Sequence, residues 1–380
     1  MHKRILPFSM VVCGAMLAYA CSSSSSDTPA KTDGGGGSSG TSGSSGDGDS
    51  SIPEGDSSTL PDGAVPDGPV ASANPIEGIA PATAVPTFTV PAVSTEGPQW
   101  HTDGLYFSTG VADGSMIKLT PPQTTAPVHG VLTVGNVPLG NAWDAKNNTF
   151  VSCEANTAAG GGGVLVRTTI AGAATPITLT FPPAPAAQAF DSPNDVVVRK
   201  ADGIIYVTDP GYQTAPTGFN HIWRVKPGGT LTAGAAFETA IAGRPNGIAL
   251  SVDEKTLYVS FTDPDSNGAP NIMKYPITGV DGAIGAGSVF VTVGTMGSSA
   301  ATQLDGLAVD SAGNVYAAVK TGVDVFKADG SGKWGHIPAP ALAATHGINN
   351  VAFGGADKKT LYMTSDDGMF QVTVKVAGLE

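Results

Sequence analysis

The chain has 380 residues and a formal net charge of −13, with 13% charged residues. Such an acidic chain, without a basic stripe, is not suited to bind nucleic acid, which requires clustered lysine and arginine. Only one of its three cysteines, Cys153, follows the first 21 residues, so sheet packing rather than an internal disulfide must hold the fold. We expect Cys153 to be a small buried strand residue rather than a nucleophile.

The first twenty residues have the pattern of an export signal. A basic start at residues 2–4 precedes an apolar stretch over residues 5–20 that is short for a membrane span. Residues 18–20, Ala-Tyr-Ala, form a small-x-small cleavage signal directly before Cys21. This predicts a signal peptide over 1–20 and a lipoprotein in which Cys21 is lipidated and becomes the first residue. Ordinary signal-peptide cleavage, which gives a secreted protein, is the alternative.

Residues 21–78 consist almost entirely of Ser, Gly, Asp, Pro and Thr. A segment of this composition cannot bury enough apolar surface to offset the entropy lost on ordering. It therefore predicts a disordered tether. We expect the protein to contact a membrane only through the N-terminal lipid, on the periplasmic or cell-surface side.

Residues 79–380 contain six copies of one pattern, in which a polar residue heads a short apolar run and a second, aromatic-bearing run follows after a turn. The marker aromatics are Tyr106, Phe150, Tyr206, Tyr258, Tyr316 and Tyr362. They are 44 to 58 residues apart, and a period near fifty with several short strands per copy is typical of a β-propeller. The sequence thus predicts an all-β fold, a single six-bladed β-propeller over 79–380, without long helices.

The polar heads of the six copies are Glu96, Asn141, Asn194, Asn246, Asp305 and Asn350. In a propeller the innermost strand of each blade starts beside the central channel, so we expect the heads to converge at one mouth. The carboxylates of Glu96 and Asp305 and the amides of Asn194 and Asn246 form an all-oxygen set, which suits Ca²⁺. The residues alone leave a second interpretation open, in which Asn-Gly and Asp-Gly are turn formers placed where strands begin.

Six blocks of the propeller resemble the gluconolactonases and regucalcin, the senescence marker protein family. The blocks read Glu96-Gly97-Pro98-Gln99-Trp100, Ser192-Pro193-Asn194-Asp195-Val196, Tyr206-Val207-Thr208-Asp209-Pro210, Arg244-Pro245-Asn246-Gly247-Ile248, Asp305-Gly306-Leu307-Ala308 and Asn350-Val351-Ala352-Phe353. This resemblance covers nearly the whole propeller and implies that Glu96, Asn246 and Asp305 bind a divalent metal. It also implies that Asn194 faces the metal or its bound substrate and that Asp305 doubles as the base.

Two further observations concern the same mouth. Many members of the family carry an arginine shortly before the Pro-Asn-Asp block that grips a polar substrate, whereas Ala189-Phe190-Asp191 occupies that stretch here. His101 and His346 lie close in sequence to Glu96 and Asn350, so both are candidates to approach the mouth. A surface or hydrogen-bonding role is the alternative for each histidine.

The resemblance, together with the all-oxygen set and the export signal, implies a metal-dependent hydrolase, gluconolactonase-like, that acts on a small-molecule lactone or related ester outside the cytoplasm. The predicted catalytic residues are Asp305 as base and Asn194 toward the developing oxyanion. Ca²⁺ is the favoured metal, with Zn²⁺, Mn²⁺ and Mg²⁺ as alternatives, and the protein is expected to be a monomer. The alternative function is a non-catalytic propeller that binds a ligand or scaffolds partners around a structural ion.

Overall fold

The computed structural model describes residues 73–84, 94–112, 114–121, 128–131, 136–156, 162–180, 189–212, 220–227, 233–240, 243–262, 270–279, 281–293, 304–340 and 347–379. Within these residues the chain is all-β, with 26 strands in six sheets of four or five and no α-helix. The predicted signal peptide, Cys21 and nearly all of the predicted tether lie outside the described residues.

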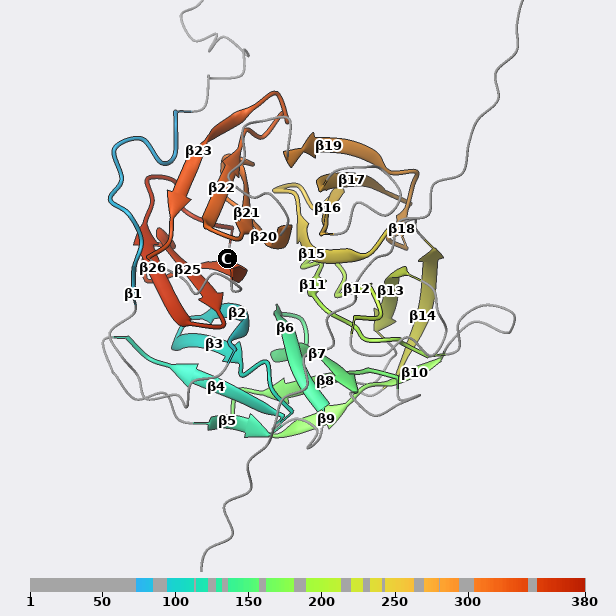
Figure 1. Cartoon of the computed structure of the whole chain (residues 1–380). Coiled ribbons are helices and arrows are strands. Elements are labelled where there is room, and N and C mark those ends of the chain that lie inside the picture. Colours follow the sequence, from blue (N-terminus) through green and yellow to red (C-terminus); the bar gives the residue numbers. More distant parts are fainter. Residues whose placement is uncertain are drawn as a thin grey trace, which may run out of the picture. The chain divides into compact units, whose positions relative to one another are not determined.

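The six sheets stand around a common centre as the blades of a propeller, as predicted (Figure 1). The first blade contains β2 (Glu96–His101), β3 (Gly104–Ser108), β4 (Ser115–Leu119) and β5 (Val128–Val131). The second contains β6 (Asn136–Asp144), β7 (Thr149–Asn156), β8 (Val164–Thr169) and β9 (Ala174–Pro176). The third contains β11 (Val196–Val198), β12 (Ile205–Asp209), β13 (His221–Pro227), β14 (Ala233–Ala240) and β10 (Thr178–Thr180), which is parallel to β14.

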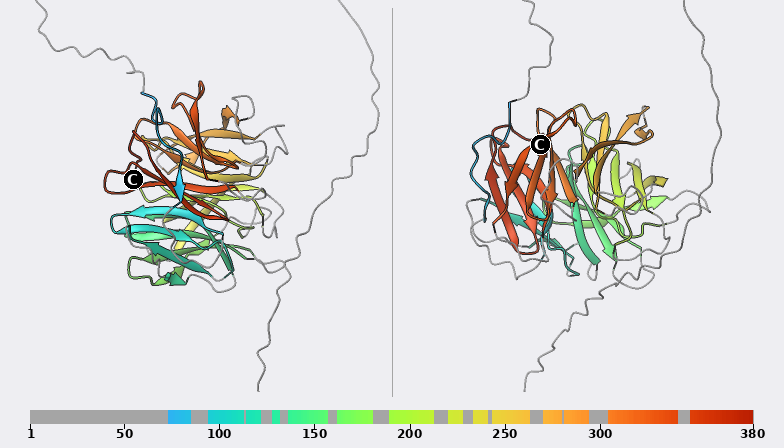
Figure 2. Two further views of the ribbon diagram at one scale, coloured as in Figure 1. Left: turned by 60° about the vertical axis from the view of Figure 1, so that its left-hand side comes forward. Right: turned by 45° about the horizontal axis from the view of Figure 1, so that its top comes forward.

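The remaining blades have the same antiparallel order. The fourth contains β15 (Pro245–Leu250), β16 (Thr256–Phe261) and β17 (Asn271–Thr278), with both β18 (Ala283–Ile284) and β19 (Ser288–Thr292) paired to β17. The fifth contains β20 (Leu304–Val309), β21 (Val315–Val319), β22 (Gly322–Phe326) and β23 (Lys333–Pro338). The sixth contains β24 (Ile348–Gly354), β25 (Thr360–Ser365), β26 (Gly368–Thr373) and β1 (Thr83–Ala84). Figure 2 shows the same blades from two further sides.

The inner strands form a closed ring. In chain order β2, β6, β11, β15, β20 and β24 each pack beside the next, and β24 packs beside β2. The sixth blade is completed by a strand from the opposite end of the propeller sequence, because β1 pairs antiparallel with β26 (Thr83 opposite Gln371). This closure fixes the positions of the six inner strands relative to one another.

The second strand of each blade supplies much of the core. The side chains of β3, β12 and β21 are buried along their whole length, since both faces of each blade pack against neighbouring blades. The marker aromatics Tyr106, Tyr206 and Tyr316 are fully buried. Cys153 in β7 is likewise a buried free cysteine, as predicted, and desolvation raises the pKa of its thiol well above the usual value.

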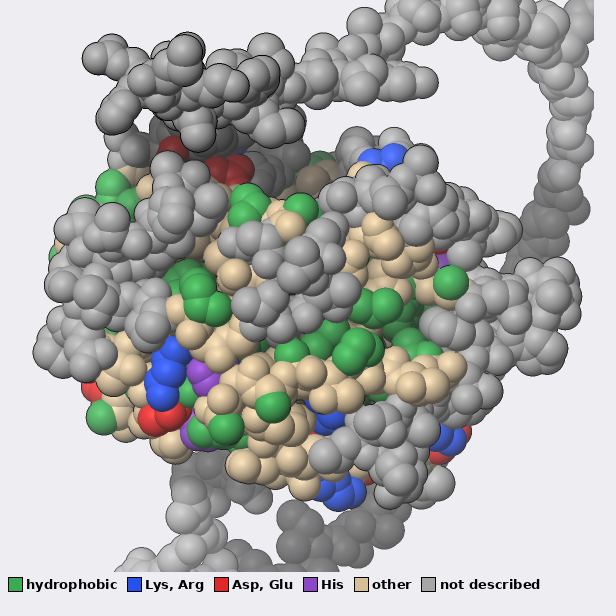
Figure 3. All heavy atoms as spheres, turned by 90° about the horizontal axis from the view of Figure 1, so that it is seen from below, with side chains coloured by type: hydrophobic (Ala, Val, Ile, Leu, Met, Phe, Trp, Pro, Cys, Tyr) green, Lys and Arg blue, Asp and Glu red, His purple; other side chains and the backbone are tan. Residues whose placement is uncertain are grey.

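Basic side chains do not form a stripe on the face of the propeller that Figure 3 shows. On the face shown in Figure 3, lysine and arginine side chains are scattered singly between polar and apolar groups rather than gathered into a stripe. In the described part of the chain, no helix is long and apolar enough to cross a membrane.

Residues ahead of β1 also pack on the propeller. The Ile76 side chain is buried in the core cluster shared by the fifth and sixth blades. The Lys375 backbone N–H donates to the Pro75 carbonyl oxygen at 3.0 Å. The predicted start of the domain at residue 79 stays a prediction. A truncation at residue 79 would remove the contacts of Pro75 and Ile76.

We expect a propeller that starts at residue 79 to fold but to be less stable than one that starts at residue 73. Loss of the Ile76 side chain and of the Pro75 hydrogen bond should lower the free energy of unfolding by about 2 kcal/mol. Urea denaturation measures this difference, and a chain that starts at residue 67 is the control and should match the one from 73. Equal stability of all three would contradict the packing described above, and aggregation of the shortest would contradict the predicted boundary.

Candidate active site

The strand register identifies which residues occupy equivalent positions at the channel mouth. In each blade the marker aromatic on the second strand lies opposite one residue of the inner strand, for example Tyr258 opposite Ala249 and Tyr316 opposite Ala308. The residue three places earlier marks the start of the inner strand. In five blades it lies at or within an irregularity of the strand register, and in the third blade it lies two residues before β11. By this rule the equivalent residues, called the head positions, are Glu96, Gly140, Asn194, Asn246, Asp305 and Asn349.

The four predicted site residues therefore do occupy equivalent positions in four blades. In the second and sixth blades the prediction was wrong by one residue, because Gly140 and Asn349, not Asn141 and Asn350, stand at the head positions. The reason is that the hairpins between the first and second strands differ in length from blade to blade. Spacing along the sequence cannot reveal such a shift.

The carboxylates of Glu96 and Asp305 stand at equivalent positions of two blades, and their charges interact. Burial raises the pKa of Glu96 well above its usual value, and the negative charges of Asp305, Asp195 and Asp366 raise it further. A hydrogen bond from the Gly97 N–H to Glu96 Oε2, 3.1 Å long, acts in the opposite direction. Like charges shift one another's pKa when they lie near each other, and the effect is stronger in a poorly solvated site than in water. Acidic groups from four blades are thus gathered at one mouth.

The Asn246 side chain presents an oxygen for which the described residues offer no partner. Asn246 is 5% exposed, and its Nδ2 donates to Thr262 Oγ1 at 2.7 Å. Its Oδ1 is buried and lacks a hydrogen-bond partner in the described part of the chain. An unsatisfied buried carbonyl oxygen costs about 1–3 kcal/mol. This atom is therefore suited to accept a ligand, and an amide oxygen beside carboxylates is the donor chemistry that Ca²⁺ prefers.

Asn194 is held at the mouth by its backbone. Its N–H donates to the Thr208 carbonyl at 2.8 Å, and its carbonyl accepts from the Gly140 N–H at 2.9 Å. The first bond lies within the third blade and the second joins it to the second blade. The half-buried side chain of Asn194 therefore starts from a fixed position in the ring of heads.

Buried hydroxyl groups of one blade hydrogen-bond to the backbone at the head position of the next blade. The residues two places after the marker aromatics, here called the inner hydroxyl positions, are Ser108, Ser152, Thr208, Ser260, Ala318 and Thr364. Thr208 Oγ1 donates to the backbone oxygen of Asn246 at 2.6 Å, and Ser260 Oγ donates to that of Asp305 at 2.7 Å. Each of these two hydroxyls thus holds the head of the following blade. A Ser or Thr at this place in five of the six copies is the sequence signal that could have identified these positions.

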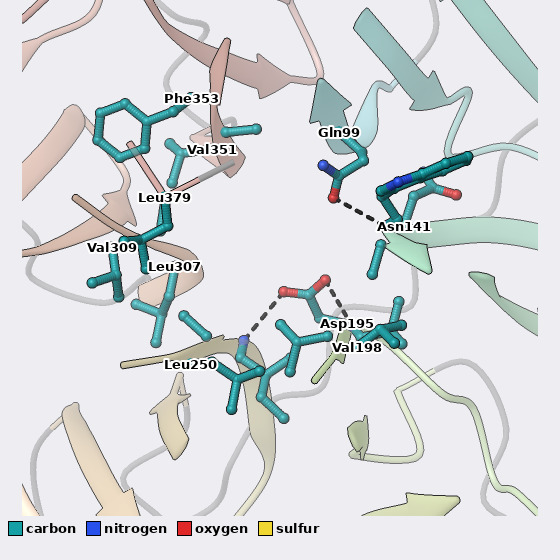
Figure 4. A pocket seen from close by; sticks show the side chains of 18 of the residues that line it. Gln99, Asn141, Asp195, Val198, Leu250, Leu307, Val309, Val351, Phe353 and Leu379 are labelled. Carbon is teal, nitrogen blue, oxygen red and sulfur yellow. Dashed lines mark hydrogen bonds between the residues drawn. The ribbon is translucent and has the colours of Figure 1, made fainter. Parts of the chain in front are cut away.

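Asp195 ties three blades together across the channel. Its carboxylate accepts from the Val196 N–H at 2.9 Å, from the Ile248 N–H at 3.2 Å and from the Asn350 side chain. Figure 4 shows the Asp195 side chain, from the residue directly before β11, among the residues that line the pocket. Gly140 approaches so closely that a Cβ there would lie 2.2 Å from Asp195 Oδ1. Burial raises the pKa of Asp195 to about 6.

A cavity of about 380 Å³ forms a second level of the same channel (Figure 4). Later residues of the inner strands line it, such as Val198, Leu250 and Val309, and Leu379 lies at its edge. None of the four predicted site residues lines this cavity, whereas Asp195 does. The head positions and the cavity are therefore separate, with Asp195 between them.

His101 lies away from the mouth, so the expectation that it approaches Glu96 is wrong. It is the last residue of β2, opposite Gly104, whereas Glu96 is the first. Five residues of extended strand span about 16 Å. Its Nδ1 lies 2.6 Å from Asp103 Oδ1, and its ring centroid lies 4.5 Å from that of Trp143. His346 lies outside the described residues.

Residues 94–367 match the sequence family described as the SMP-30/Gluconolactonase/LRE-like region. The chain belongs to this family. A gluconolactonase of Zymomonas mobilis is 29% identical over 201 residues, which are 50% of this chain and 52% of that protein, so the match spans about half of the relative. A solved gluconolactonase of Xanthomonas campestris is 26% identical, with a TM-score of 0.59 over 79% of this chain and 99% of that one. A calcium-binding regucalcin of Agrobacterium tumefaciens shares the fold, at 19% identity and a TM-score of 0.56 over 79% of this chain and 95% of that one.

The donor set of this family member depends on its amides. In the described residues no group of three or more His, Cys, Asp and Glu side chains is arranged to hold a metal ion. Two carboxylates alone give too few ligands for Ca²⁺, which takes six to eight oxygens as a rule. The amide oxygens of Asn194 and Asn246, together with substrate and water, are the groups that would complete such a set.

The stability of the metal-free protein should rise as the pH is lowered from 8 to 5. Burial raises the pKa of Asp195 to about 6 and that of Asp209 to about 7, and the pKa of Glu96 is raised by burial and by Asp305. A carboxyl group whose pKa is about 4 when unfolded and higher when folded binds more protons in the folded protein. Its contribution to stability is therefore lost as the pH rises from about 4 through the folded pKa.

Calorimetry in the presence of a chelator measures this dependence. We expect the melting temperature to be roughly 3–6 °C higher at pH 5 than at pH 8. Asp195→Asn should reduce the slope, because it removes one of the groups that titrates. A melting temperature that is highest at pH 8 would show that these carboxylates are not destabilised by the fold.

Proposed function

We propose that this protein hydrolyses a lactone or related ester and that the reaction depends on a divalent cation, with Ca²⁺ favoured. Glu96, Asn194, Asn246 and Asp305 would hold the ion. The observation that carries the proposal is the buried Oδ1 of Asn246, which has no hydrogen-bond partner among the described residues and lies at the mouth where the charges of Glu96 and Asp305 repel one another. The gluconolactonases among the relatives and the calcium-binding regucalcin support the same chemistry.

The hydrogen bonds of Asn246 and Asn194 indicate a different role for each residue in the proposed reaction. When bound, the cation supplies Lewis-acid polarisation of the lactone carbonyl and positions oxygen ligands. Because the Asn246 nitrogen donates to Thr262, its oxygen is the atom of this amide that would hold the ion. Asn194 is then the amide placed to donate an N–H to the oxyanion that develops on the substrate.

Asp305 is the proposed general base. Its carboxylate accepts a proton from the water that attacks the carbonyl carbon, and it returns that proton to the leaving alcohol oxygen of the opened ring. The Ser260 hydroxyl fixes the Asp305 backbone and thereby limits the positions that the carboxylate can take. Glu96, whose charge Asp305 repels, serves as a ligand rather than as a second base.

We further propose that the propeller works outside the cytoplasm, anchored through a lipid on Cys21. The basic start, the apolar stretch and the Ala-Tyr-Ala-Cys cleavage site support this placement. The tether of residues 21–78 would then let the mouth reach small molecules at a distance from the membrane.

Substitution of Asp305 tests the site directly. We expect Asp305→Asn to abolish the rise in melting temperature on addition of Ca²⁺, since an ion stabilises only the state that binds it. Hydrolysis of a panel of neutral and acidic lactones, followed by titration of the released acid, should fall by a factor on the order of 10² or more. Asn194→Ala should lower turnover more than it lowers the Ca²⁺ response.

The matched control is Asp253→Asn, at the turn between β15 and β16, the opposite end of β15 from Asn246. Asp253 accepts from Ser251 Oγ at 2.7 Å in an exposed turn, so its loss should leave the ion response and hydrolysis unchanged. A Ca²⁺ response in the parent without any lactone hydrolysis would favour the alternative of a binding propeller with a structural ion. An Asp305→Asn variant that keeps the parent's Ca²⁺ response would refute the site itself.

A further inference from the structure

One hydroxyl group links the inner strands of the fourth and fifth blades at their heads. Thr262 follows directly after β16 and is half-buried. Its Oγ1 accepts a hydrogen bond from Asn246 Nδ2 at 2.7 Å and donates one to the carbonyl oxygen of Leu304, the residue before Asp305. Thr262 therefore joins the side chain of one head residue to the backbone beside another.

The two bonds of Thr262 fix the direction in which the Asn246 amide points. A hydroxyl carries one proton, and that of Thr262 is donated to Leu304. Toward Asn246 the hydroxyl therefore presents lone pairs, which accept from an NH2 group and repel a carbonyl oxygen. Exchanging the two ends of the amide would oppose two oxygens or break the bond to Leu304. Nδ2 thus stays toward Thr262, and the other end of the amide is the buried Oδ1 that has no hydrogen-bond partner among the described residues.

The acceptor of the Thr262 proton is itself held in place. Leu304 is fully buried, and the Asp305 carbonyl that follows it accepts from Ser260 Oγ at 2.7 Å. The inner strands approach closely there, since a Cβ on Gly247 would lie 2.4 Å from the same Asp305 oxygen. Two successive carbonyls of β20 are thus held by hydroxyls two residues apart, those of Ser260 and Thr262.

The equivalent position in other blades distinguishes two kinds of amide head. It lies four residues after each marker aromatic, is here called the orienting position, and is occupied by Gly110, Glu154, Pro210, Thr262, Lys320 and Asp366. In the sixth blade Asp366 Oδ1 accepts from Nδ2 of the head residue Asn349 at 3.1 Å, as Thr262 accepts from Asn246. In the third blade Pro210 has no side-chain acceptor to offer Asn194. An acceptor at the orienting position therefore directs the nitrogen of an amide head in two blades, and the third blade lacks one.

We propose that Thr262 is a positioning residue that holds Asn246 Oδ1 toward a divalent cation at the mouth. This inference rests on the proposed cation site and names the residue that sets the orientation of one ligand within it. Thr262 is not a ligand itself, because it acts through the Asn246 amide. An amide that is already oriented loses less conformational freedom when the ion binds, so Thr262 should raise the affinity for the ion.

Calorimetric titration of the chelator-treated full chain with Ca²⁺ tests this role. In Thr262→Val, which keeps the shape but has neither acceptor nor proton, we expect Kd to rise on the order of tenfold. Thr262→Ser keeps the hydroxyl and should stay within about threefold of the parent. The matched control is Thr278→Val in the same blade, because Thr278 Oγ1 donates to the Ala283 carbonyl at 3.2 Å at the end of β17 away from the heads. It should leave Kd unchanged.

A double variant separates orientation of the amide from general support of the backbone. Asn246→Asp replaces the amide by a carboxylate, whose two oxygens are equivalent and which needs no orienting group to bind a cation. If Thr262 acts through the amide, adding Thr262→Val to Asn246→Asp should change Kd by less than about twofold. An equal loss of affinity in both backgrounds would show that Thr262 only supports the backbone, and would overturn the inference.

The outcomes also separate this inference from the proposed function. If the parent binds Ca²⁺ and Thr262→Val binds it equally well, the orienting role is refuted while the cation site stands. If Thr262→Ser loses as much affinity as Thr262→Val, the role is refuted as well, since serine keeps the hydroxyl. If the parent binds neither Ca²⁺ nor Mn²⁺, the proposed cation site fails and the orienting role fails with it. Thr262→Ala, which also lacks the hydroxyl, replaces Thr262→Val should the latter not fold.

Discussion

Repulsion between the half-buried carboxylates at the channel mouth is the constraint on which the interpretation of this protein depends. Glu96 and Asp305 come from the first and fifth blades, yet the charge of one raises the pKa of the other in a poorly solvated mouth. A fold that gathers negative charge in this way needs either protons or a cation to offset the repulsion. At neutral pH a divalent ion would offset this repulsion, and it would also supply a partner for Asn246 Oδ1, which has none among the described residues.

The architecture around the mouth keeps these groups together. A closed ring of inner strands fixes the relative positions of the blades, and Thr208 and Ser260 hold the backbones of Asn246 and Asp305 from the preceding blade. Asp195 links the third, fourth and sixth blades with three accepted hydrogen bonds. The site is therefore preorganised by bonds between blades rather than by any single blade, which is the condition for electrostatic catalysis without reorganisation.

Much of the fold could be predicted because the propeller is a repeat. Six copies of one pattern near fifty residues apart indicated six blades, and the heads Glu96, Asn194, Asn246 and Asp305 followed from that pattern. The sequence did not reveal that Gly140 and Asn349 take the head positions in the other two blades, because hairpins of unequal length shift the register there. His101 was placed wrongly for a related reason, since closeness in sequence along an extended strand means distance in space.

Other features of the site could be recognised only from the three-dimensional structure. The inner hydroxyls were visible as Ser or Thr two residues after an aromatic, but their role became clear only from the bonds that they make to the next blade. Thr262 lies outside the six blocks that resemble the family, and its bond to Leu304 depends on the fourth and fifth blades lying side by side.

The central claim is that the head positions converge on one cation. The most direct measurement is the crystal structure of the propeller grown with Ca²⁺ and again with Mn²⁺, in which anomalous scattering locates the ion. We expect one strong peak at the mouth, about 2.3–2.6 Å from Asn246 Oδ1 with Ca²⁺ and in contact with the carboxylates of Glu96 and Asp305. No peak at the mouth at saturating ion concentration, with Asn246 Oδ1 bonded to ordered water alone, would contradict the account.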